Sequence, residues 1–197
     1  MSEVSAVFTP CSETDLLALL HEGHVKAFDE DPSPERLGFA WAQMALEMGR
    51  GKKIRCGNFG NITVSKSWTG DFFTLHVPPP DPPVLRFRAY PSLLTGATGY
   101  WSFMDQRFHD ELALFDSGNA YLTAQKLGEV HYYLADRETY SRAVEALYAE
   151  YQKRLKGVST EPSAEELSLA GTLWRLHDDL DEGLQGIDAI DAVVKGS

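Results

Sequence analysis

Glu47 stands at the position in this sequence that is best suited to acid chemistry. It lies at the edge of an apolar stripe at helical spacing, formed by Leu37, Trp41, Met44 and Met48. Gly49 and Gly51 follow, and glycine is typical of the place where a helix ends. A carboxylate in the last turn meets the partial negative charge of the helix C-terminus, and apolar neighbours remove water from it. Both effects favour the protonated form, which a general acid requires.

The element that must position this carboxyl group is a helix that begins near Ser33. Ser33 can cap its N-terminus, and Pro34 suits the first helical turn. Glu35 lies where the helix dipole favours an acid. The helix by itself leaves a second interpretation open, in which Glu47 simply points into solvent.

Three short motifs occur in order around the end of this helix. They are Ala45–Gly51 (ALEMGRG), Asn58–Ile62 (NFGNI) and Phe87–Tyr90 (FRAY). Their order and spacing resemble the signature of the peptidoglycan glucosaminidases of the lysozyme superfamily, the flagellar and autolysin type. The resemblance covers about residues 35–155, which is most of the chain.

This resemblance implies a mainly α (α+β) fold, a lysozyme-like helical domain with a small β-lobe at about residues 57–90. It implies hydrolysis of the β-1,4 glycosidic bonds of peptidoglycan by an N-acetylglucosaminidase, with Glu47 as the proton donor. Muramidase and lytic transglycosylase activities are alternatives within the same chemistry. Peptidoglycan is the expected partner, and no metal or organic cofactor is implied.

A second catalytic carboxylate is harder to place. The family often carries a glutamate in a T-x-E motif of the β-region, but this sequence has Thr74-Leu75-His76, with His76 in its place. Asp71 and Asp81 are the acids of the β-region, and either could hold a water molecule. Asp71 follows Trp68-Thr69-Gly70, so shaping a turn is its alternative role. The acetamido group of the substrate can also act as nucleophile, and that route needs no second acid.

Several residues are candidates for contact with a sugar. Tyr132 and Tyr133 lie in a turn that resembles the family's tyrosine turn, where a tyrosine faces the catalytic glutamate; Tyr133 fits best, and Tyr140 is expected in the core. Asn58 can bind substrate or hold the loop below the acid. The remaining candidates are Trp68, which could stack on a saccharide, and His76.

Hydrophobic periodicity predicts the other elements. Helices are expected at residues 13–28, 92–108, 119–128 and 137–155, and strands at Ile62–Val64, Asp71–Val77 and Val84–Phe87. The proline-rich residues 78–83 predict a rigid loop between two strands. Residues 1–156 are therefore expected to form the glucosaminidase-like domain. Residues 157–197 are expected as a C-terminal helical extension, with a helix at about 163–182.

Composition excludes several classes of function. The formal net charge of −11 argues against nucleic-acid binding by electrostatic attraction. No apolar run reaches the roughly 18 residues that suggest a membrane span. Cys11 and Cys56 could be free thiols or one disulfide, and neither has zinc-ligand spacing. A local basic run, Arg50, Lys52, Lys53 and Arg55, could attract acidic groups of a wall polymer or could simply be solvated.

The N-terminal residues show neither the basic nor the apolar region of a secretory signal. We therefore expect synthesis in a bacterial cytoplasm and action in the periplasm of a target cell, as an antibacterial effector or a phage-type lysin. An injected enzyme would have a cognate immunity protein, and a delivery-machine component is another expected partner. The alternative from a different class is a catalytically degenerate domain that binds wall or builds a phage tail or secretion complex, which the histidine at position 76 favours.

Overall fold

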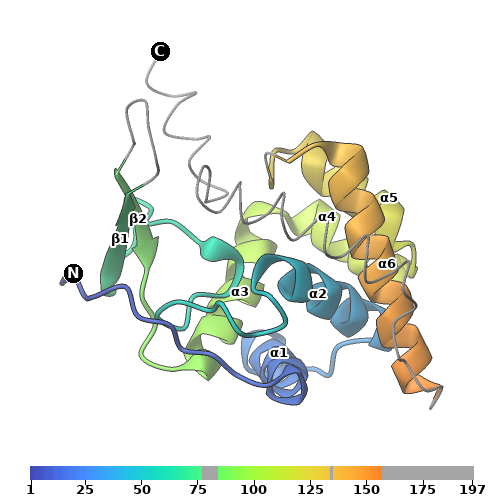
Figure 1. Ribbon diagram of the computed structural model, residues 1–197, viewed down its shortest axis with the longest axis horizontal. Helices are drawn as coiled ribbons and strands as arrows, with labels where there is room; N and C mark the ends of the chain where they lie inside the picture. The colour runs from blue at the N-terminus through green and yellow to red at the C-terminus, as the bar shows by residue number, and fades with distance from the viewer. Residues whose placement is uncertain (77–83, 134, 157–197) are drawn as a thin grey trace.

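The computed structural model describes residues 1–76, 84–133 and 135–156, and it confirms a mainly helical fold with a small β-lobe (Figure 1). The α-helices are α1 (Glu13–Phe28), α2 (Pro34–Glu47), α3 (Leu93–Arg107), α4 (His109–Ala113), α5 (Ala120–Glu129) and α6 (Arg137–Leu155). Two 3-10 helices, η1 (Phe59–Asn61) and η2 (Leu114–Ser117), and two strands, β1 (Phe72–His76) and β2 (Val84–Arg88), complete the elements. The predicted loop at 78–83 and the predicted C-terminal extension lie outside the described residues, so they remain predictions.

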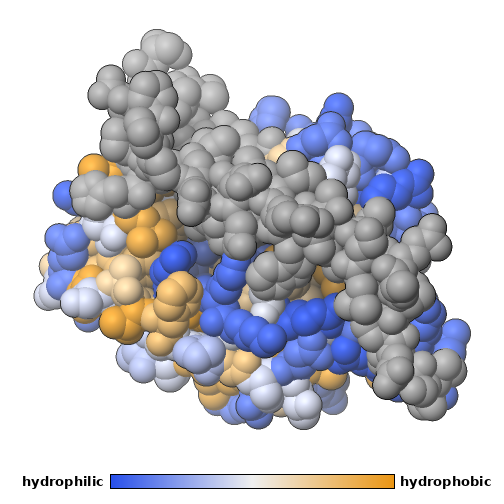
Figure 2. All heavy atoms as spheres, viewed as in Figure 1, coloured by the Kyte–Doolittle hydropathy of each residue, from blue (hydrophilic) through white to orange (hydrophobic). Residues whose placement is uncertain are grey.

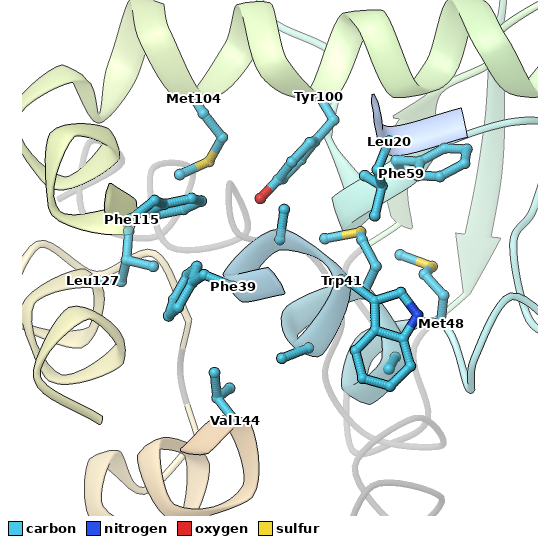
Figure 3. Close-up of a cluster of buried hydrophobic side chains, with 14 of the residues drawn as sticks. Leu20, Phe39, Trp41, Met48, Phe59, Tyr100, Met104, Phe115, Leu127 and Val144 are labelled. Carbon is cyan, nitrogen blue, oxygen red and sulfur yellow. The ribbon is translucent and has the colours of Figure 1, made fainter. Parts of the chain in front are cut away.

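Helix α2 forms the centre of the helical part. It packs against α1 and α6 (Figure 1), and every residue from Gly38 to Ala45 is buried. The side chains around it come from all the long helices and converge on one apolar core (Figure 3). Its start is as predicted, because the Ser33 hydroxyl accepts a hydrogen bond from the Arg36 backbone N–H at 3.0 Å. A helix that is buried all round is fixed in place by packing rather than by its own polar contacts.

Gly38 explains how closely α6 can approach α2. A Cβ atom at this position would lie 2.5 Å from the ring of Tyr151 and 2.9 Å from the ring of Tyr148. Both tyrosines belong to α6 and are buried. The missing side chain therefore gives two aromatic rings room to pack directly on the α2 backbone.

The β-lobe is built from more of the chain than its two strands. Strands β1 and β2 pair antiparallel, with Phe73 opposite Phe87. The predicted strand at Ile62–Val64 is reduced to one isolated bridge, Thr63 with Phe87, because η1 ends directly before it and the Ser65–Trp68 turn follows. The N-terminal segment, residues 2–9, lies along the other side, where the Val4 N–H donates to the Phe72 carbonyl and the Cys56 N–H to the Val7 carbonyl.

Surface character differs between the two parts. Apolar side chains gather over the β-lobe side of the visible face, whereas the helical side is largely hydrophilic (Figure 2). Exposed apolar residues include Val4, Val7 and Phe8 of the N-terminal segment and Val84 of β2. No described helix is long and apolar enough to cross a membrane.

The two cysteines are free thiols in this structure. Cys56 is buried beneath the N-terminal segment, and its Sγ lies 3.3 Å from the Ser5 carbonyl oxygen. Burial, followed by the nearby charge of Asp15, raises the pKa of Cys11 to about 11. The environment of Cys11 therefore disfavours a reactive thiolate at neutral pH.

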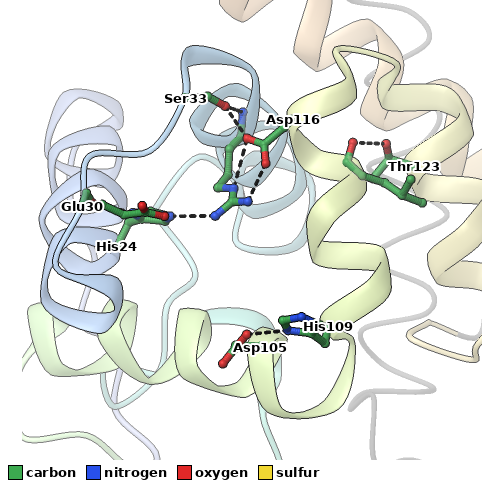
Figure 4. Close-up of polar contacts among 9 residues, drawn as sticks. His24, Glu30, Ser33, Asp105, His109, Asp116 and Thr123 are labelled. Atoms are coloured by element: carbon green, nitrogen blue, oxygen red, sulfur yellow. Dashed lines mark hydrogen bonds and ion pairs between the residues drawn. The ribbon is translucent and has the colours of Figure 1, made fainter.

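A buried histidine joins α1 to the start of α2 (Figure 4). His24 is fully buried, and its Nδ1 must donate to the Glu30 carbonyl oxygen at 2.9 Å, because a carbonyl can only accept. Its Nε2 then accepts from the Arg36 guanidinium at 3.2 Å. Arg36 is held in turn by the Asp116 carboxylate, which also accepts from the Ser33 hydroxyl. A second proton on the ring would have to bind Nε2, and it would break the hydrogen bond that Nε2 accepts from Arg36.

This arrangement predicts that the fold loses stability on mild acidification. Burial first, and the Arg36 charge next, hold the pKa of His24 below its usual range, so the unfolded chain binds a proton before the folded chain does. The stability is present above the unfolded pKa of about 6.5 and is lost as pH falls below it. Thermal unfolding measured from about pH 7.5 to about pH 5.5 should show a falling midpoint.

His24→Gln should lower the midpoint at the higher pH, because its packing with Phe28 and Trp101 is lost, and should flatten the pH dependence. His131→Asn is the matched control, since His131 is exposed and asparagine tolerates its left-handed backbone. Equal slopes for the parent and His24→Gln would contradict the assignment.

Candidate active site

Glu47 is the last residue of α2, and its side chain is half-buried. Its Oε1 accepts a hydrogen bond from the Tyr140 hydroxyl at 2.7 Å, although 93 residues separate the two in sequence. Tyr140 lies in the first turn of α6 and is buried. A carboxyl group with one oxygen held by a fixed donor and a partly exposed position has the geometry of an acid that can meet a ligand.

The turn after Glu47 is fixed by an unusual backbone and by charge. Gly49, Arg50 and Gly51 all adopt left-handed backbone conformations, with φ of 54°, 56° and 88°. The backbone N–H of Arg50 donates to the Ala45 carbonyl at 3.0 Å, so the chain folds back onto the helix end. A left-handed arginine is strained by roughly 1–3 kcal/mol, and such a residue persists only when its surroundings hold it.

An ion-pair cluster holds Arg50 in this backbone conformation. The Arg50 guanidinium bonds Glu13 of α1 at 2.8 Å and Glu150 of α6 at 2.7 Å, and Arg154 bonds the same two carboxylates. Both guanidinium groups lie over the Trp41 ring, at 5.7 and 5.3 Å from its centroid. Arg50 therefore braces the end of α2 against two helices, and it does not act as part of an isolated basic run.

Two buried residues that the sequence analysis missed extend the contact of Glu47 into the core. Gln43 lies one helical turn before Glu47, and its Nε2 donates to the Tyr140 hydroxyl at 3.4 Å. Tyr100 of α3 donates to the Gln43 Oε1 at 2.7 Å. Tyr100 and Gln43 are fully buried. The signal that could have found Gln43 is a lone amide four residues before the acid in an otherwise apolar helix.

The predicted tyrosine turn packs against Tyr140. Tyr133 stacks on Tyr140 with ring centroids 3.7 Å apart, and its hydroxyl donates to the Ala124 carbonyl. Tyr132 is fully buried and meets the Phe108 ring edge-on at 5.2 Å. Tyr140, which was expected only as a core aromatic, contacts Glu47 through its hydroxyl. The stacked Tyr133 ring therefore helps to fix the position of the Tyr140 ring.

The tyrosine hydroxyls of this site keep their protons at neutral pH. Burial, with the Glu47 charge as the next cause, raises the pKa of Tyr140 well above its usual range. The same two causes raise the pKa of Tyr100, and burial raises the pKa of Tyr133. Tyr140 and Tyr100 therefore act as hydrogen-bond donors and not as phenolate nucleophiles.

Asn58 holds the loop that follows the helix end. Its Oδ1 accepts from the Ile62 N–H, and its Nδ2 donates to the carbonyls of Ile62 and Arg88, each at 2.9 Å. The side chain is 1% exposed. These bonds tie the NFGNI motif to the end of β2, and they use both N–H donors and the carbonyl oxygen of the amide.

The β-lobe candidates have polar and backbone contacts with the strands and the N-terminal segment. Trp68 is half-buried, with its indole N–H donating to the Asp71 carbonyl and the Arg88 guanidinium 4.9 Å from its ring. Asp71 is exposed, and its Oδ1 accepts from the backbone N–H of Ser2 at 3.0 Å. The backbone of His76 pairs with Val84 at the end of β1. Asp81 lies outside the described residues, and the part of the chain that is described contains no acidic, histidine or cysteine cluster fit to hold a metal.

Known structures share this fold. The glycoside hydrolase domain of FlgJ from Salmonella typhimurium superposes with a TM-score of 0.54 at 18% identity, over 75% of this chain and 92% of that domain. A peptidoglycan hydrolase from Sphingomonas sp. A1 superposes with a TM-score of 0.52 at 21% identity, over 75% of this chain and 98% of that protein. No family model and no curated protein matches the sequence. The likeness shows that the chain has a lysozyme-like glycoside hydrolase fold.

The ion-pair cluster predicts a salt-dependent contribution to stability. Arg50→Gln leaves two half-buried carboxylates with one guanidinium, so the free energy of unfolding should fall by about 1–2 kcal/mol at low salt. Denaturant unfolding in about 1 M NaCl should show a smaller difference from the parent, because salt screens the charges.

Arg142→Gln is the control for this measurement, since Arg142 also pairs with two glutamates but on an exposed surface. It should leave the free energy of unfolding nearly unchanged at both salt concentrations. Equal losses for the two variants would show that the bracing role is absent.

Proposed function

We propose that this protein hydrolyses β-1,4 glycosidic bonds in the glycan strand of peptidoglycan, with Glu47 as the general acid. The observation that carries the proposal is a half-buried carboxyl group at the end of a fully packed helix, held by the Tyr140 hydroxyl. The fold supports it, because solved proteins of this fold include a peptidoglycan hydrolase and a glycoside hydrolase domain. The three sequence motifs around the site supply independent support.

The proposed reaction begins with proton transfer from Glu47 to the oxygen that bridges two sugars. The bond between that oxygen and the anomeric carbon breaks, and its electron pair stays on the oxygen. The positive charge on the anomeric carbon is met by an oxygen nucleophile. Water then attacks the same carbon, while the bond between that carbon and the nucleophile breaks and its electron pair returns to the nucleophile. The hydroxyl of the water stays on the carbon, and the remaining proton goes to the Glu47 carboxylate, so the site is restored.

For the nucleophile, we infer that the acetamido carbonyl oxygen of the substrate is used, as in some glycosidases. Asp71 is engaged with the N-terminal segment through Ser2, and the T-x-E position carries His76. Activity that survives in the double variant Asp71→Asn, Asp81→Asn would support this route. Loss of activity in that variant would favour a water-holding carboxylate instead.

The decisive test is digestion of purified peptidoglycan by the parent protein and by Glu47→Gln. The amide keeps the shape of the side chain but has no acidic proton, so activity should fall at least about 100-fold. Circular dichroism of both proteins checks that the fold is kept. A parent protein that leaves the glycan intact would indicate a domain that only binds wall.

Mass spectrometry of the released fragments identifies which bond is cut. An N-acetylglucosaminidase leaves N-acetylglucosamine at the new reducing end, and a muramidase leaves N-acetylmuramic acid. A lytic transglycosylase leaves an anhydro sugar and no reducing end. We expect the first of these products.

The proposed setting is an antibacterial effector or phage-type lysin that acts in the periplasm, where peptidoglycan lies. Expression in a bacterial host with an added export signal should therefore cause lysis, whereas expression in the cytoplasm should not. Exported Glu47→Gln should be harmless at equal protein level. Lysis from the cytoplasm, or lysis by exported Glu47→Gln, would contradict this setting. Co-expression with a neighbouring gene product that suppresses lysis would identify a cognate immunity protein.

A further inference from the structure

Gln43 occupies a place that packing alone does not explain. It is a fully buried amide on α2 between two tyrosine hydroxyls, one from α3 and one from α6. Burying an amide is costly unless it is hydrogen-bonded, so an apolar residue would serve the core better. The Tyr100 side chain extends from the middle of α3, and its hydroxyl points toward α2 (Figure 3).

The direction of each hydrogen bond in this chain follows from the chemistry of its members. Tyr100 has one proton and donates it to the Gln43 Oε1 at 2.7 Å. The Gln43 Nε2 then faces the Tyr140 hydroxyl at 3.4 Å, and an amide nitrogen can only donate. The Tyr140 oxygen is thereby used as an acceptor, and its own single proton must point at the Glu47 Oε1.

We propose that Gln43 is a positioning residue that keeps the Tyr140 hydroxyl a donor to Glu47, so that the acid's transferable proton resides on Oε2. This inference rests on the proposed function of Glu47. Oε1 is an acceptor in the fixed chain, and a protonated carboxyl group has one proton, which the other oxygen must then carry. Without the amide donor, a protonated Glu47 can instead donate a hydrogen bond from Oε1 to the Tyr140 oxygen, and this bond holds the proton away from a substrate.

The lengths of the two bonds set the expected size of the effect. The Tyr140 contact with Glu47 at 2.7 Å is short, whereas the Gln43 contact with Tyr140 at 3.4 Å is long for an N–H donor. Removing the Gln43 amide should therefore change the titration midpoint of Glu47 less than removing the Tyr140 hydroxyl. Tyr140→Phe should give the larger effect and Gln43→Met the smaller, in the same direction.

The test uses the full chain with 13C-labelled glutamate side-chain carboxyl groups, titrated by NMR without substrate. The spectrum of Glu47→Gln identifies the Glu47 signal. Gln43→Met removes the amide at similar volume, and Tyr100→Phe removes the donor that orients it. Both should move the titration midpoint of Glu47 upward, because the neutral carboxyl group gains an acceptor in the Tyr140 oxygen.

Kinetics on soluble glycan fragments supply the second measurement. Gln43→Met and Tyr100→Phe should lower kcat about tenfold with little change in KM, because proton delivery and not binding is impaired. The control is Thr123→Val, which removes another buried hydroxyl that bonds the Leu114 and Asn119 carbonyls. It should lower thermal stability but move neither the Glu47 midpoint nor kcat.

The outcomes separate this inference from the proposed function. Unchanged Glu47 midpoints in both Gln43→Met and Tyr100→Phe would overturn the positioning role, whatever the activity. If the Glu47 midpoints shift in the two variants but the parent protein cleaves no glycan, the hydrogen-bond arrangement is supported and the hydrolase function is rejected. Tyr100→Phe also keeps the test decisive if Gln43→Met fails to fold.

Discussion

Burial of the central part of α2 is the constraint on which the rest of the structure depends. The buried stretch from Gly38 to Ala45 cannot rotate or shift without opening the core on several sides at once. Glu47 lies two residues beyond it, so packing determines where the carboxyl group lies. Truncating a buried aromatic such as Trp41 costs about 3–5 kcal/mol, whereas a hydrogen bond contributes about 1 kcal/mol. Apolar contacts therefore place the acid, and polar contacts only orient it.

Helix α6 contributes to both tasks. Tyr140 in its first turn bonds the carboxyl group, and Glu150 near its other end bonds the arginine that follows the acid. The same helix packs its tyrosines onto the α2 backbone at Gly38. The orientation of the acid and the strained turn beside it thus depend on one rigid element, so a shift of α6 would disturb both together.

The sequence predicted what local rules determine. The bounds of α1 and α6 were predicted to the residue, and the Ser33 cap and the glycine-rich stop of α2 were found where expected. Contacts between distant residues were not predictable in the same way. The chemistry of Tyr140 depends on a partner 93 residues away, so its helical spacing suggested only a core aromatic. The prediction of a strand at Ile62–Val64 was wrong, because β-propensity does not report the turns that flank this segment.

The pairing of the N-terminal segment with the β-lobe has a consequence for the order in which the protein can fold during synthesis. Residues 2–9 leave the ribosome well before their partners at residues 54–56 and 72. Likewise, Glu13 can pair with Arg154 only after a further 141 residues have been translated. Loop-closure entropy makes such remote contacts slow to form. The acid on α2 therefore acquires its surroundings only when nearly all of the described chain has been translated.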